Sequence, residues 1–148
     1  MSVIQTEWAK GQRATPSGCA AGDVKTVELS YTIKDGATLA AADIVELGFL
    51  PAFHQIVGAK LVNDALGGTI TANVGFITGD PGSEAVGTEL YSAQSVAAAA
   101  ATELNSAYAL RLPSVDENRR LGLKLSADAT ASGDKVLTLV LQYAASSN

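Results

Sequence analysis

The stretch DVKTVELSYTIKDG, residues 23–36, decides the fold. Apolar and polar side chains alternate along it, which is the period-two pattern of a strand with one buried and one exposed face. The apolar positions are Val27, Leu29, Tyr31 and Ile33. The pair Asp35-Gly36 then supplies turn chemistry and ends the pattern. The stretch therefore predicts a half-buried β-strand.

The same kind of pattern recurs along the rest of the chain. Strand signals lie at residues 27–33, 45–49, 55–62, 69–76, 88–92, 108–112, 121–125 and 136–143. Turn residues, mainly Gly, Asp and Pro, separate them, and no helices alternate with them. This favours an all-β fold, namely an antiparallel two-sheet β-sandwich. Eight strands after an N-terminal arm match an eight-stranded jelly roll better than the immunoglobulin type, whose Cys-Trp-Cys core is absent.

One segment departs from the strand pattern. Residues 95–104 read SVAAAAATEL, and Ala favours a helix because it loses no side-chain entropy there. A helix this short is marginal on its own. The segment Ala97–Ala101 is therefore either a helical turn across an edge of the sandwich or a small-residue segment lying flat against a neighbour. The sequence leaves both interpretations open.

Residues 1–22 show no sustained period and predict an extended N-terminal arm, followed by a single β-sandwich domain at residues 23–148. The arm combines apolar and basic side chains and has no strand partner of its own. Its candidate contacts with a partner are Val3, Ile4, Trp8, Lys10 and Arg13. Trp and Arg often dominate the binding energy of interfaces. The alternative is a frayed terminus whose Trp8 folds back onto the sandwich.

Composition limits the classes of function. The chain has 148 residues, enough for one sizeable core. Charged residues make up only 17%, below the roughly 25% of soluble domains, so its faces suit coverage by neighbouring subunits. The net charge of −5 argues against nucleic-acid binding. Without a bilayer-spanning apolar run or a signal peptide, we expect no membrane partner and synthesis in the cytoplasm.

No motif for catalysis or for a cofactor emerges. His54 is the only histidine, and nothing beside it resembles a nucleophile elbow, so we interpret it as a loop or strand-edge residue. Cys19 and His54 are too few ligands for zinc. Asp80, Glu84 and Glu89 flank a Pro-Gly turn, but their spacing does not match a calcium-binding loop. We therefore expect no catalytic residue, no cofactor and no metal.

A compact charged loop surrounds Asn118. Its charged members are Asp116, Glu117, Arg119 and Arg120. One interpretation is a hydrophilic connection between two strands. The other is a rim whose charges pair with opposite charges on a partner, which makes these four residues further contact candidates.

Four stretches carry a resemblance to a known family. They are MSVIQTEW (1–8), VKTVELSYTI (24–33), FLPAFH (49–54) and VLTLVLQY (136–143). With the small, acidic, Ala-, Gly- and Thr-rich composition, the chain resembles the head cement, or decoration, proteins of tailed bacteriophages. The resemblance implies a structural protein without an active site, made in the host cytoplasm and located on the outer capsid surface of the virion. It also implies the major capsid protein as partner, self-association as a homodimer or homotrimer, and the arm as a strap.

Two other functions are compatible with a β-sandwich. A carbohydrate-binding or adhesin-like module would expose Tyr or Trp side chains together on one surface. A small enzyme would need a polar pocket that brings His54 beside Asp or Glu. The structure can therefore distinguish these alternatives from a capsid-binding protein.

Overall fold

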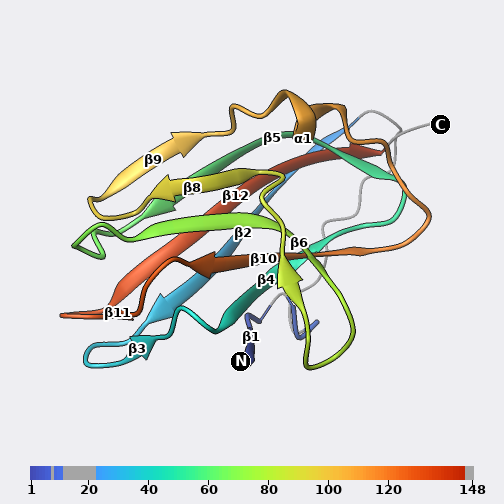
Figure 1. Cartoon of the computed structure of the whole chain (residues 1–148). Helices are drawn as coiled ribbons and strands as arrows, with labels where there is room; N and C mark the ends of the chain where they lie inside the picture. The colour runs from blue at the N-terminus through green and yellow to red at the C-terminus, as the bar shows by residue number, and fades with distance from the viewer. Residues whose placement is uncertain (8, 12–22, 146–148) are drawn as a thin grey trace.

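The computed structural model describes residues 1–7, 9–11 and 23–145. This part of the chain is built almost wholly of β-strands, with one short helix (Figure 1). The elements are β1 (Val3–Gln5), β2 (Val24–Ile33), β3 (Thr38–Leu39), β4 (Ile44–Leu50), β5 (His54–Asn63), β6 (Thr71–Thr78), β7 (Ala85–Val86), β8 (Tyr91–Ser95), β9 (Ala100–Glu103), α1 (Ala107–Arg111), β10 (Arg119–Leu125), β11 (Ala129–Thr130) and β12 (Lys135–Ala145). The helix is too short to cross a membrane.

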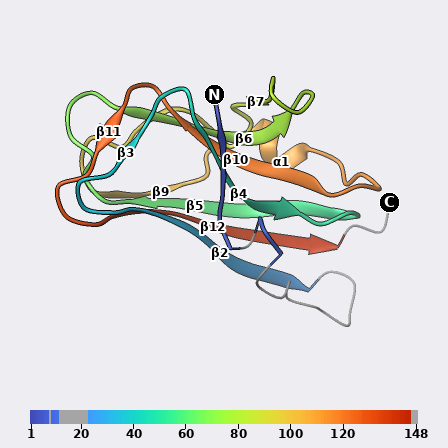
Figure 2. The ribbon, with the colours of Figure 1, turned by 90° about the horizontal axis from the view of Figure 1, so that it is seen from below.

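Most of the strands form two sheets that lie face to face (Figure 2), and β3 and β11 pair with each other in a small two-stranded sheet. One sheet has the order β2-β12-β5-β9, and the other runs β1-β4-β10-β6 with β7 and β8 both pairing along β6. In the described part of the chain, β2, β4, β5, β6, β8, β9, β10 and β12 are the strands of four or more residues. Within each sheet these strands pair antiparallel. Their order, β2-β12-β5-β9 facing β4-β10-β6-β8, is that of a jelly roll.

The core lies between the two sheets and is aliphatic. In one sheet Leu139 of β12 pairs with Leu29 of β2 on one side and with Leu61 of β5 on the other, and all three are buried. In the facing sheet Leu123 of β10 lies between buried valines of β4 and β6. Burying one such side chain contributes about 1.5–3 kcal/mol. The alternation in the sequence therefore marks the inward face of each sheet.

Seven of the eight strand signals are confirmed, and the signal at residues 108–112 is wrong. That segment contains α1, not a strand. The hydroxyl of Ser106 accepts a hydrogen bond from the Ala109 amide at 3.1 Å and caps the helix. The same hydroxyl donates to the Glu89 carbonyl at 3.0 Å, which fixes the helix against the rest of the fold. The alternation at Tyr108 and Leu110 predicted a strand wrongly, because both side chains are exposed and the pattern does not mark a buried face.

The helical interpretation of the alanine segment is also wrong. Residues 97–98 form a bend, and from Ala100 the chain is β9, an edge strand. Ala101 and Thr102 pair with Val62 and Leu61 of β5. Hydrogen bonding to a preformed strand outweighs the helix propensity of Ala here. The segment lies flat, but against its own sheet, and its packing against another copy stays a prediction.

The expectation that the N-terminal arm has no strand partner is wrong for its first residues. Residues Val3–Gln5 form β1, which pairs parallel with Ile44–Glu46 of β4. The edge of β4 offers unpaired backbone groups, and pairing satisfies them. Trp8 lies outside the described residues, and so does the segment 12–22, which includes Arg13. The division of the chain at residue 22 stays a prediction.

Candidate functional site

A buried carboxylate organises the outer face of the larger sheet. Glu46 of β4 is only 5% exposed. Its two oxygens accept hydrogen bonds from the Arg120 guanidinium of β10 at 3.0 and 2.8 Å. The Gln5 amide of β1 donates to the same carboxylate at 2.9 Å. The cluster thus ties three neighbouring strands together.

The charges in this cluster stabilise one another. Burial acts to raise the pKa of Glu46, but the hydrogen bonds from Arg120 and Gln5, with the charge of Arg120, outweigh it and hold the pKa below its usual value. The bond with Glu46 raises the pKa of Arg120. The Glu84 carboxylate also lies 3.6 Å from this guanidinium. Arg120 therefore engages two carboxylates of its own chain, and its contact with a partner stays a prediction.

The first residues of the chain are fixed in place. The backbone amide and hydroxyl of Ser2 donate to the Asp43 carboxylate at 3.1 and 2.8 Å, and these bonds lower the pKa of Asp43. The Thr6 amide donates to the Glu46 carbonyl at 2.9 Å, and its hydroxyl donates to the Leu47 carbonyl. Val3 and Ile4 are half-buried, and Ile4 packs against the core. Val3 and Ile4, which are predicted contacts with a partner, therefore pack within the chain's own sheet.

Lys10 lies beside a groove between the N-terminal segment and β2. The backbone amide of Lys10 donates to the Thr6 carbonyl at 3.0 Å, and the residue is exposed. The groove has a volume of about 490 Å³, with Gln5, Thr6, Glu7 and Lys10 on one side and Glu28, Ser30, Tyr31 and Thr32 on the other. This predicted residue is therefore placed where a partner could reach it.

Arg119 has a different environment from its neighbour Arg120. Its guanidinium lies 4.8 Å from the centre of the Phe76 ring, and Nη2 donates to the His54 carbonyl at 3.3 Å. Its Nε is buried without a hydrogen-bond partner, and burial lowers the pKa of the group. A depression of about 600 Å³ lies alongside it, lined also by Glu89 and Glu117. Arg119 is thus a half-buried cation at the edge of this depression.

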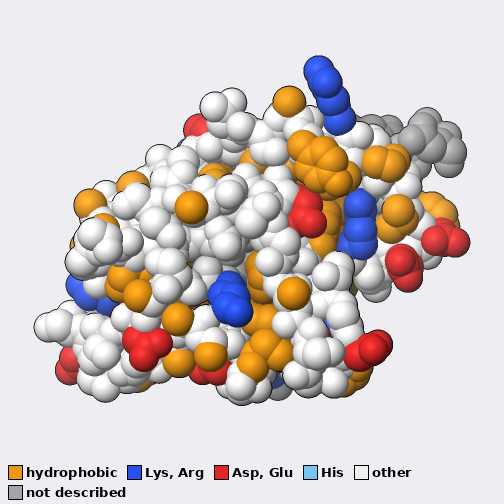
Figure 3. Space-filling view, viewed as in Figure 1, with side chains coloured by type: hydrophobic (Ala, Val, Ile, Leu, Met, Phe, Trp, Pro, Cys, Tyr) orange, Lys and Arg blue, Asp and Glu red, His pale blue; other side chains and the backbone are white. Residues whose placement is uncertain are grey.

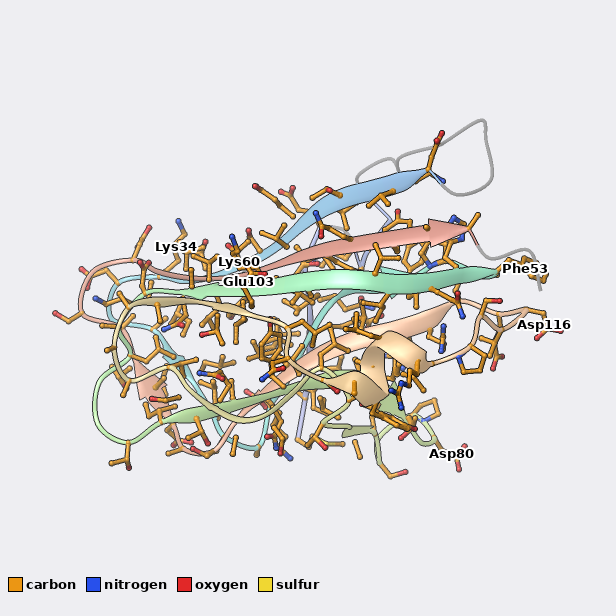
Figure 4. All side chains as sticks on the ribbon, turned by 90° about the horizontal axis from the view of Figure 1, so that it is seen from above. Lys34, Phe53, Lys60, Asp80, Glu103 and Asp116 are labelled. Carbon is orange, nitrogen blue, oxygen red and sulfur yellow. The ribbon has the colours of Figure 1, made fainter. Side chains whose placement is uncertain are left out.

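The most exposed part of the charged loop lies at one end of the sandwich. Phe53, in the loop between β4 and β5, is 57% exposed and has a left-handed backbone with φ of 62°. Its amide donates to the Val115 carbonyl at 2.7 Å, which brings it beside the exposed Asp116 and Glu117. Figure 4 shows Phe53 and Asp116 at the same end of the molecule. We call Phe53, Asp116 and Glu117 the Phe53 tip.

The backbone of the Phe53 tip is held in place. The Asn118 side chain accepts a hydrogen bond from the Ala52 amide at 2.8 Å, next to the bond between Phe53 and Val115. A left-handed conformation costs a non-glycine residue about 1–2 kcal/mol. These bonds therefore hold an aromatic side chain outward at an energetic cost. Sequence reasoning missed Phe53, and the available signal was an aromatic residue in the turn that begins at Pro51.

His54 does not form a catalytic pair in the described residues. Its Nδ1 lies 2.8 Å from the Ala52 carbonyl, and its Nε2 lies 3.4 Å from the Lys25 ammonium. Its ring packs edge-on against Tyr143, with centroids 5.2 Å apart. Both ring nitrogens therefore have polar neighbours within the fold. The interpretation of His54 as a strand-edge residue is confirmed, because it begins β5.

The acidic turn after β6 has structural partners for two of its carboxylates. Glu84 accepts a hydrogen bond from the Gly82 amide at 3.1 Å, and Glu89 accepts one from the Phe76 amide at 3.1 Å. Across the described ranges, no three His, Cys, Asp or Glu side chains are placed to hold a metal ion. The carboxylates of Glu84 and Glu89 therefore bind backbone amides of their own chain.

The exposed aromatic residues do not form a glycan platform in the part of the chain that the structure describes. Tyr108 is 65% exposed, whereas Tyr91 and Tyr143 are buried and Tyr31 is half-buried. Figure 3 shows hydrophobic side chains gathered over α1 and the loop that follows it, beside basic and acidic ones. Such a mixed patch is typical of a protein–protein contact surface.

Comparison with known proteins gives the family. No family model and no curated protein matches the sequence. A chain from the solved structure "Capsid of Ralstonia phage GP4" is 33% identical, with a TM-score of 0.87, and the match covers 99% of both chains. A chain from the "Cyanophage Pam1 capsid asymmetric unit" is 24% identical over 90% of this chain and 92% of that one, with a TM-score of 0.67, and shares the fold. The protein belongs to the same family as the chain of the Ralstonia phage GP4 capsid, a family of phage capsid proteins.

Proposed function

We propose that the protein is a cement, or decoration, protein that binds the outer capsid surface of a tailed phage and stabilises the lattice of the major capsid protein. The observation that carries the proposal is the full-length similarity to a chain of a phage capsid. The low charge content, 17%, supports it, because such a surface suits coverage by neighbouring subunits. The role is structural and needs no catalytic group.

The Phe53 tip is the proposed contact with the major capsid protein. Aromatic side chains held rigidly outward are efficient anchors, because little conformational freedom is lost when they bind. Asp116 and Glu117 flank Phe53 and would steer it toward basic side chains on the shell. Lys10 lies on the groove beside β2 and is a second contact candidate. Trp8 and Arg13 remain predicted contacts from the sequence.

Binding at more than one contact explains how modest surfaces could stabilise a shell. Each contact that forms on a preformed lattice raises the effective concentration of the next one. A homodimer or homotrimer would multiply the contacts again. Copies placed across junctions between major capsid subunits would then resist the internal pressure of packaged DNA.

Co-sedimentation with expanded empty heads of the parent phage tests the proposal. We expect the wild-type protein to pellet with the heads at a fixed ratio to the major capsid protein and to saturate. Unexpanded heads serve as the comparison, because binding after expansion predicts less protein in that pellet. Wild-type protein that stays in the supernatant at all head concentrations would contradict the proposal.

A further inference from the structure

We propose that the open edge of β2 accepts an extended segment of a neighbouring capsid-shell subunit, which adds a strand to the sheet β2-β12-β5-β9. The inference rests on the proposed function, since the partner it names is part of the shell. It assigns a site on β2, separate from the Phe53 tip. Its evidence is the direction of the backbone groups of β2.

The register shows which residues of β2 have backbone groups at the open edge. The Asp64 amide donates to the Val136 carbonyl at 3.0 Å, in line with the pairing of Asn63 and Leu137. In an antiparallel ladder, alternate residues of a central strand bond to opposite neighbours. Even-numbered residues of β12 from Val136 onward therefore bond to β5, and odd-numbered ones such as Leu137 bond to β2.

The same alternation applies to β2. Leu137 pairs with Tyr31, and Leu139 pairs with Leu29, so the odd-numbered residues of β2 bond to β12. The residues whose amide and carbonyl groups point to the other side are Val24, Thr26, Glu28, Ser30 and Thr32. No backbone hydrogen bond to these groups from elsewhere in the described residues is present. A row of unpaired donors and acceptors is a template for another strand.

The sequence of β2 lacks the devices that usually protect an exposed edge. Edge strands are commonly short, bulged or interrupted by proline. β2 has ten residues without Pro or Gly, and it pairs with β12 without a register shift. Its charged side chains are Lys25 and Glu28, and Lys25 is directed to His54. The edge is therefore long and regular.

Space is available beside this edge. The groove of about 490 Å³ separates Glu28, Ser30 and Thr32 from the N-terminal segment that carries Thr6 and Lys10. Its walls are polar, which suits backbone hydrogen bonding more than burial of large apolar side chains. Addition of a strand to a sheet edge is a common mode of recognition, in which main-chain hydrogen bonds supply the affinity.

Charge favours a different chain over a second copy as the occupant. Two copies of β2 paired antiparallel with their outer faces together, overlapping at residues 24–32, would place Glu28 directly opposite Glu28 of the other copy. Like charges in that position are destabilising. Glu28 has no ion pair within the described residues. The expected occupant is therefore a shell segment that carries Lys or Arg where it passes Glu28.

Proline at Ser30 tests the edge directly. Ser30→Pro removes an amide that points outward and leaves the backbone hydrogen bonds to β12 intact, and proline is tolerated at such edge positions. The matched control, Ser30→Ala, removes the same hydroxyl and its 2.9 Å contact with Thr138, but keeps the amide. We expect Ser30→Pro to bind expanded heads about tenfold more weakly than Ser30→Ala. Equal binding by two folded variants would overturn the inference while the proposed function stands.

Amide exchange of the isolated wild-type protein keeps the inference testable if Ser30→Pro does not fold. Measured by NMR, the amides of Thr26, Glu28 and Ser30 should exchange fast, and those of Val27 and Leu29 slowly. Slow exchange of both sets would show that the edge is already occupied and would overturn the inference. Failure of the wild-type protein to bind heads would instead contradict the proposed function, and with it the partner named here.

Discussion

The carboxylate of Glu46 and the guanidinium of Arg120 form two hydrogen bonds, at 3.0 and 2.8 Å, across the β4–β10 pair. Gln5 joins the same carboxylate from β1. The buried charge of Glu46 therefore adds a side-chain attachment to the backbone pairing that holds β1 on β4. The N-terminal residues therefore contribute to the stability of the domain, whether or not they also contact a partner.

Removing Arg120 should strongly destabilise the fold. Arg120→Ala leaves the Glu46 carboxylate buried with only Gln5 as side-chain partner, and we expect the free energy of unfolding to fall by about 3 kcal/mol. This is the low end for a buried pair, because the guanidinium is partly exposed. Urea unfolding measures the change. Arg111→Ala is the control, because the Arg111 side chain at the end of α1 is exposed. An Arg120→Ala variant as stable as this control would contradict a stabilising role for the bonds between Arg120 and Glu46.

Acid should weaken the domain through Glu46. An unfolded Glu has a pKa of about 4.3, and the pKa of Glu46 in the folded protein is lower. The unfolded state therefore takes up the proton first, so this stabilisation is present above about pH 4.3 and is lost as the pH falls through the folded pKa. Asp43 and Asp134 also have lowered pKa values and add to the acid loss. Glu46→Gln should flatten this part of the stability curve, and Glu117→Gln, which changes an exposed carboxylate, is the control.

Glycine at position 53 should separate binding from stability. Phe53→Gly removes the exposed ring and relieves the left-handed backbone, so we expect the free energy of unfolding to change by less than about 1 kcal/mol. Binding to expanded heads should weaken at least tenfold. Ala93→Gly is the matched control, since Ala93 is the other described non-glycine residue with positive φ, at 49°. If Phe53→Gly binds expanded heads as tightly as the wild-type protein, the Phe53 tip is not part of the interface.

Loss of the helix cap should have a smaller and local effect. Ser106→Ala removes the bond to the Ala109 amide and the bond to the Glu89 carbonyl, and we expect a loss of about 1–2 kcal/mol. Thermal unfolding measures it. Ser106→Asp restores the acceptor for the cap but not the donor, and should recover part of the loss. Equal stability of all three proteins would show that the cap does not hold α1.

The sequence was sufficient for the sandwich because burial on one face produces alternation. Leu29, Leu61 and Leu139 follow the pattern and meet in the core. The pattern failed at Tyr108 and Leu110, whose alternation is unrelated to burial, since both are exposed. At Ala100 the local helix propensity was overridden by pairing with β5, a contact distant in sequence. Alternation therefore indicates a strand only where one face of the segment is buried.

Much of the candidate site depends on pairing that one sequence cannot reveal. β1 is short and pairs with β4 about 40 residues away, so no local pattern announces it. The charged loop was recognised, but which of its arginines is taken up by Glu46 depends on the register of β10 against β4. Phe53 stands out through its backbone angle, which no side-chain pattern encodes.

The position of the protein on the shell is the most direct test of a cement function. Electron cryo-microscopy of expanded heads saturated with the wild-type protein would show it. We expect sandwich-shaped density on the outer surface, over junctions between major capsid subunits, with the Phe53 tip directed toward the shell. Density on the inner surface, or a sandwich that itself forms the continuous shell, would contradict the proposed function.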